Sequence, residues 1–154
     1  MKLVKQTKKG YQYQLKREDV EALRFLVRQF PLTAFSPIKI SKTDTEAKER
    51  EKLLNESLSE HRDGLKRKAR NFIRRDKFKI SGKNRFYHLS LEAREAMLQI
   101  LNDMRVESWR ALGEPENLEV NVYSLTKERI KYYRLMYLSG YFEHHFLNLE
   151  DEKE

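Results

Sequence analysis

Basic side chains, which bind anions, are concentrated between residues 66 and 85. This segment holds ten Lys and Arg residues against a single acid, Asp76, and so carries a charge of +9. Because the whole chain carries +8, all its other residues together carry −1. A block of one sign attracts phosphates and other polyanions over long distances, and salt screens that attraction. The same composition is also typical of an ordinary solvated surface, and the sequence leaves both interpretations open.

Helical periodicity divides residues 65 to 77 into an apolar face and a basic face. At about 100° per residue, Leu65, Ala69, Phe72 and Ile73 share one arc, and the basic residues lie opposite. The predicted anion-binding or nucleic-acid-binding residues are Lys66, Arg67, Arg70, Arg74, Lys77, Lys83 and Arg85. The last two lie near the tip of a predicted hairpin. The rings of residues 86 to 88 follow and could stack on bases if they are exposed.

Residues suited to catalysis or metal binding are few. The chain has no cysteine and five glycines, and it contains no GxGxxG, GxxxxGK or GxSxG motif. Its four histidines form no HxxxH or HExxH pair, and His144 and His145 would point about 100° apart on a helix. We therefore expect no metal, no cofactor and no enzymatic activity.

Aromatic residues near the C-terminus invite a ligand-binding interpretation. Four tyrosines, at positions 132, 133, 137 and 141, fall within three turns of one predicted helix. Rings at helical spacing are normally core residues, so we predict that Tyr137 and Tyr141 are largely buried. Trp109 is predicted to pack in the same core. His61 lies in an apolar stripe, where a hydrogen-bonded packing residue is expected.

The elements that would position these residues are mainly helical. Apolar spacing and capping residues predict helices near 17–30, 44–76, 91–112 and 125–146. Gly64 leaves open whether the second segment is one helix or two. A hairpin is expected at the N-terminus, and KFKI and RFYHL, flanking SGKN, predict another.

The predicted fold is therefore mainly α. We expect a single-domain bundle of about four helices with one or two small β-hairpins, packed around the last helix. The domain would span residues 1–149, and residues 150–154 would form a frayed acidic tail.

Two resemblances to known families carry different information. Over residues 65–101, the helix, basic hairpin and SLEAREAMLQIL locally resemble the recognition helix, wing and closing helix of winged-helix DNA-binding domains. Over more of the chain, the opening hairpin, the run LNDMRV and the tyrosine-rich last helix resemble the uncharacterised bacterial family called domain of unknown function two thousand and seventeen. That resemblance implies a small helical bacterial protein without established catalytic residues, encoded in some members near the adaptor of the Clp protease.

Within LNDMRV, Asn102, Asp103 and Arg105 would form a polar cluster on a helical packing surface. Such a cluster serves fold specificity or contacts a partner. We accordingly expect a non-catalytic regulatory or adaptor-type protein that binds an unidentified protein partner. The alternative is nucleic-acid or polyanion binding through residues 66–85. The absence of cysteine, of a signal peptide and of a long apolar run predicts a cytoplasmic protein that does not associate with membranes.

Overall fold

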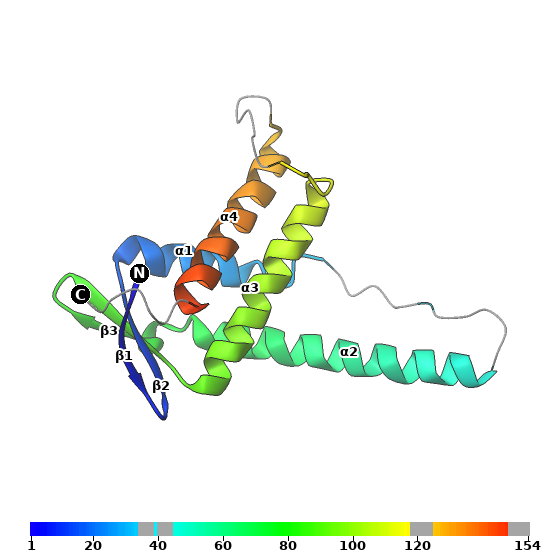
Figure 1. The fold of residues 1–154 in the computed structure, drawn as a ribbon, viewed down its shortest axis with the longest axis horizontal. Helices are drawn as coiled ribbons and strands as arrows, with labels where there is room; N and C mark the ends of the chain where they lie inside the picture. Colours follow the sequence, from blue (N-terminus) through cyan, green and yellow to red (C-terminus); the bar gives the residue numbers. More distant parts are fainter. Residues whose placement is uncertain (34–38, 40–44, 118–124, 148–154) are drawn as a thin grey trace.

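A computed structural model describes residues 1–33, 39, 45–117 and 125–147 (Figure 1). The helices and strands follow in the order β1 (Lys2–Thr7), β2 (Gly10–Leu15), α1 (Arg17–Arg28), α2 (Thr45–Phe72), β3 (Phe78–Ser81), β4 (Asn84–Leu89), α3 (Leu91–Ala111) and α4 (Lys127–Leu147). A short 3-10 turn, Arg75–Lys77, connects α2 to β3. The predicted acidic tail at 150–154 lies outside the described residues.

The strands form one antiparallel sheet of four strands in the order β1-β2-β4-β3. Each predicted hairpin is present, β1 with β2 and β3 with β4. Between them, β2 pairs with β4 over five residue pairs, from Tyr11 with Leu89 to Leu15 with Arg85. This pairing joins two segments about 70 residues apart in the chain into a single sheet.

The prediction of a helical bundle with small hairpins is therefore wrong, because the fold is mixed α and β. Turn residues and alternation reveal each hairpin locally, but nothing local records that two hairpins share an edge. The burial pattern of β2 shows that the sheet contributes side chains to the core. Tyr11, Tyr13 and Leu15 alternate along β2 and are all buried, while Gln12 and Gln14 between them are half-buried, so one face of the sheet packs in the core.

The helices begin and end close to the predicted positions. Ser90 caps α3, since its hydroxyl oxygen accepts a hydrogen bond from the amide of Ala93 at 3.1 Å. Gly113 follows α3 with a φ of 86°, the left-handed conformation that often ends a helix. α2 is one continuous helix through Gly64. In Figure 1 its N-terminal half extends away from the sheet, while α3 and α4 lie side by side.

The core lies between the sheet and the helices α1, α3 and α4. Its largest fully buried side chains are Tyr13, Tyr87, Phe142 and Phe146, with leucines, methionines and Ile100 around them. The ring of Tyr13 meets Phe146 edge-on, with 5.0 Å between centroids. The guanidinium of Arg94 donates two hydrogen bonds to the carbonyl of Phe146, which ties the end of α4 to α3. The sheet and α3 thus hold the C-terminal end of α4.

The predicted burial of Tyr137 is wrong. Its side chain is 73% exposed, while Tyr141 is half-buried. α4 carries apolar residues on two faces, and the face that enters the core presents Leu135, Phe142 and Phe146. The prediction that the molecule packs around α4 fails for the same reason, because the other face of this helix points outward.

Candidate functional site

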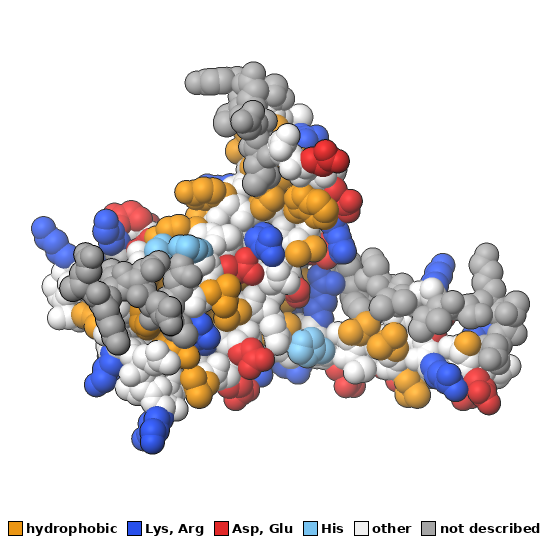
Figure 2. Space-filling view, viewed as in Figure 1, with side chains coloured by type: hydrophobic (Ala, Val, Ile, Leu, Met, Phe, Trp, Pro, Cys, Tyr) orange, Lys and Arg blue, Asp and Glu red, His pale blue; other side chains and the backbone are white. Residues whose placement is uncertain are grey.

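A groove lies between α3 and α4 on the side of α4 that points away from the core. Its volume is about 890 Å³. The α3 side and the segment after it contribute Arg105, Val106, Trp109, Pro115 and Glu116, and α4 contributes Tyr133, Met136, Tyr137, Gly140, Tyr141 and His144. Hydrophobic side chains gather over both helices in the space-filling view (Figure 2). We call this feature the α3–α4 groove.

Two exposed aromatic rings dominate the α3–α4 groove. Trp109, predicted to be a core residue, is instead 37% exposed, and its indole N–H donates to the carbonyl of Pro115 at 3.2 Å. That bond fixes the orientation of the indole ring. Tyr137 stands on the opposite wall and is the more exposed of the two. Trp and Tyr are enriched in protein interfaces because they supply large contact areas at low entropic cost.

A tyrosine anchored by α1 completes the α4 wall. The Tyr141 hydroxyl donates a hydrogen bond to the Asp19 carboxylate at 3.2 Å. Burial and the nearby negative charge of Asp19 raise the pKa of Tyr141 to about 12. The hydroxyl therefore keeps its proton at neutral pH and continues to donate. This contact holds the groove wall against α1.

The predicted polar cluster on α3 is divided between two surfaces. Arg105 lines the α3–α4 groove, where its guanidinium forms a 2.8 Å ion pair with Glu143 of α4 and donates a 3.0 Å hydrogen bond to the side-chain Oδ1 of Asn102. Asp103 lies on the side that faces α2. Partial desolvation raises the pKa of the Asp103 carboxyl, and the positive charge of Arg62 opposes that rise. Only Asn102 and Arg105 therefore belong to one site.

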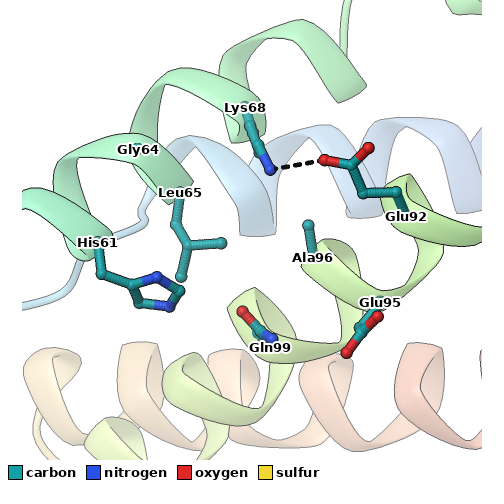
Figure 3. Close-up of a pocket in the computed structure, with 8 residues that line it drawn as sticks. All are labelled: His61, Gly64, Leu65, Lys68, Glu92, Glu95, Ala96 and Gln99. Carbon is teal, nitrogen blue, oxygen red and sulfur yellow. Dashed lines mark hydrogen bonds and ion pairs between the residues drawn. The ribbon is translucent and has the colours of Figure 1, made fainter.

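A smaller polar cleft lies between α2 and α3 (Figure 3). Its volume is about 280 Å³, and its walls include His61, Gly64, Glu92, Glu95 and Gln99. Lys68 crosses it to form a 3.0 Å ion pair with Glu92. His61, predicted to be a packing residue, is exposed at the rim. Lys68 and Glu92 neutralise each other, and among the described residues no other Lys or Arg side chain lines the cleft.

The predicted basic strip is present on the outer face of α2 and beyond it. Leu65, Ala69 and Ile73 are buried, and Phe72 is half-buried. The predicted residues Lys66, Arg67, Arg70, Arg74, Lys77 and Lys83 are exposed, and Arg85 is half-buried. Arg74 pairs with Asp76 at 3.1 Å. Lys66, Arg67, Arg70 and Lys77 form no ion pair with any residue in the described ranges.

The aromatic residues beside this strip are less available than the sequence suggested. Tyr87 is fully buried, stacks on Phe78 and donates its hydroxyl to the carbonyl of Phe72 at 3.0 Å. Phe86 is half-buried and His88 is exposed. Base stacking could therefore involve His88 and the edge of Phe86, but not Tyr87.

Sequence reasoning identified the strip and missed the α3–α4 groove. One signal for the groove was available, because Gly140 interrupts an otherwise strongly helical segment.

In the ranges that the structure describes, no three His, Asp or Glu side chains lie close enough together to hold a metal ion.

No family model, curated protein or solved structure matches the chain. The two family resemblances therefore stay predictions from sequence. Across the described helices, none is long and apolar enough to cross a lipid bilayer.

Proposed function

We propose that this chain is a non-catalytic regulatory protein that acts by binding a protein partner in the α3–α4 groove. The observation that carries the proposal is that two exposed rings, Trp109 and Tyr137, line one groove together with Gly140. Large rings around a recess are the usual composition of binding hot spots. Arg105, oriented by its ion pair to Glu143, adds the residue type that joins Trp and Tyr at such sites.

Gly140 supports the proposal because the fold itself does not require a glycine there. A glycine inside a helix is less favourable than alanine by about 1 kcal/mol. A Cβ built at Gly140 meets no heavy atom within 4 Å, and the residue lies within the α4 helix. The space above Gly140 is therefore free for a group from outside the chain.

A comparative affinity purification from the native cell tests this function. The double variant Trp109→Ala and Tyr137→Ser removes the two rings. The amount of co-purifying partner is expected to fall at least tenfold, which corresponds to a loss of about 1.4 kcal/mol or more of binding free energy. Quantitative mass spectrometry measures the partner, and circular dichroism checks that the variant folds.

The matched control is the pair Arg67→Gln and Arg70→Gln, which leaves the α3–α4 groove intact and should retain the partner. If the groove variant retains every partner at wild-type level, the groove is not the binding site. Loss of the partner with the control variant alone would point instead to the basic strip.

A second candidate function, nucleic-acid or polyanion binding, is favoured by those cations of the strip that form no ion pair within the described residues. Lys66, Arg67 and Arg70 are exposed on α2, Lys77 is exposed in the 3-10 turn after it, and Lys83 is exposed in the turn of the β3–β4 hairpin. Cations that are not neutralised within the protein are free to displace counterions from phosphates.

The salt dependence of binding tests this candidate. Affinity for a random DNA duplex should fall as a power of salt concentration, with a slope of about −0.9 per phosphate neutralised. Replacing Arg67→Gln and Arg70→Gln should reduce the slope by about one to two without lowering the melting temperature. Fluorescence anisotropy at several salt concentrations gives the slope.

The control makes the same change in net charge elsewhere. Arg17 and Arg50 are exposed and already paired with Glu21 and Glu46. Replacing both with glutamine should leave the slope nearly unchanged. Undetectable binding by wild type at about 50 mM salt and micromolar protein would reject nucleic-acid binding by the strip.

A further inference from the structure

The outward face of α4 carries a heptad seam. Ile130, Tyr133, Tyr137, Gly140, His144 and Leu147 follow one another at spacings of 3, 4, 3, 4 and 3 residues. This is the a/d spacing by which helices pair as coiled coils. α4 already uses a different face, with Leu135, Phe142 and Phe146, for the core. The seam thus lies on a face of α4 separate from the face that enters the core.

The seam is exposed at both ends and in the middle. Ile130 is 42% exposed, Tyr137 is 73% exposed and Leu147 is 56% exposed. From Ile130 to Leu147 the seam runs through about 26 Å of helix, at roughly 1.5 Å per residue. Four of its six positions also line the α3–α4 groove.

The order of residues along the seam is self-complementary for an antiparallel pair. A two-fold axis placed between Tyr137 and Gly140 sets Tyr137 of each copy opposite Gly140 of the other. The same operation sets Tyr133 opposite His144 and Ile130 opposite Leu147. The most exposed ring thereby meets the residue without a side chain, and two aliphatic residues meet at each end. A contact of this kind is isologous and closes as a dimer.

Charge also favours a second copy as the occupant. None of the six seam positions is an acid, a lysine or an arginine. The positive charge of this chain lies instead on residues 66–85, which carry +9. Two seams can therefore approach without opposing like charges.

We infer that the partner of the α3–α4 groove is a second copy of this chain, bound through antiparallel pairing of the two α4 helices. This inference rests on the proposed function, because it names the occupant of the same groove. In the pair, Tyr137 of each copy fills the space above Gly140 of the other, and Trp109 and Arg105 flank the contact from α3.

Sedimentation measures the self-association directly. Wild-type protein is expected to change from monomer to dimer between about 1 and 500 µM, with no species beyond the dimer. Gly140→Ala should weaken the dimer about tenfold, because a methyl group overfills the position that receives Tyr137. The same substitution should leave the dilute monomer at least as stable to heat as wild type. A purely structural role for Gly140 would lower both properties together.

Cysteine cross-linking determines the direction of pairing, and the chain is suited to it because it has no native cysteine. In an antiparallel pair, residues 130 and 147 of different copies adjoin, while the two residues 130 lie about 26 Å apart. A mixture of Ile130→Cys and Leu147→Cys variants should therefore form a disulfide in a glutathione redox buffer, and neither variant should do so alone. Leu53→Cys, an exposed residue of α2, is the control for random collision.

Each result has a definite meaning for the inference. A dimer that cross-links only in the mixture supports it. A disulfide formed by Ile130→Cys alone indicates parallel helices and overturns the antiparallel register. A monomer at every concentration up to about 500 µM overturns self-association. The proposed function would then still stand if the affinity purification recovered a foreign protein that depends on Trp109 and Tyr137.

Discussion

Replacing Gly10→Ala is expected to lower the free energy of unfolding by more than about 4 kcal/mol, a loss that single substitutions seldom cause. Gly10 begins β2 with a φ of 148°, a conformation that residues with a side chain rarely adopt. A Cβ at this position would lie 2.1 Å from the carbonyl oxygen of Leu89 and 2.9 Å from the Cα of Ser90. Both neighbours are backbone atoms, so no side chain can rotate away to relieve the clash.

The clash lies where β2 meets the end of β4. We therefore expect Gly10→Ala to separate the two hairpins, which urea denaturation followed by circular dichroism would report. Gly64→Ala is the matched control, because Gly64 is helical and a Cβ there meets nothing within 4 Å. It should stabilise the protein by about 1 kcal/mol. A Gly10→Ala variant within about 1 kcal/mol of wild type would show that the hairpins are not locked together here.

Phe142→Ala is expected to destabilise the protein by about 3 to 5 kcal/mol, the usual cost of emptying an aromatic core position. Phe142 is fully buried on the inward face of α4, edge-on to Tyr141 at 5.1 Å and stacked on Phe146 at 6.4 Å. The substitution removes these ring contacts and leaves a cavity between α4 and the rest of the core. Urea denaturation gives the change in unfolding free energy.

Tyr137→Ala is the control, since it makes a similar truncation on the outward face of the same helix. Its effect on stability should be within about 0.5 kcal/mol of wild type. Both measurements belong at a protein concentration where wild type sediments as a monomer, so that loss of the dimer contact does not enter. A larger loss of stability for Tyr137→Ala than for Phe142→Ala would mean that α4 is inserted with its other face inward.

The helices could be predicted from sequence because their signals are local. Ser90, Gly113 and the apolar period of residues 65–73 act within a few residues of the elements that they define. The two faces of α2 followed directly from 100° spacing, which places Lys66, Arg67 and Arg70 on the exposed face. That spacing was expected to extend to Arg74 and Lys77, but α2 ends at Phe72, so these two residues are exposed in the turn that follows it.

The sheet and the α3–α4 groove could not be predicted, because both depend on which surfaces meet. The pairing of β2 with β4 leaves no trace in either hairpin alone. On α4, Tyr137 and Phe142 are equally apolar in a helical pattern, and only packing against the sheet and α3 decides which one is buried. The prediction that Trp109 packs in the core is wrong for the same reason, because its ring lines the groove and is exposed.

The pairing of β2 with β4 also bears on how the chain acquires its fold as it leaves the ribosome. β2 emerges early, but its second neighbour is not synthesised until about 70 residues later. At about 5 to 20 residues per second, β2 waits several seconds with one edge unpaired. An unpaired edge is a template for unwanted association. We therefore expect nascent chains that stop between residues 16 and 83 to need chaperones more than the finished protein does.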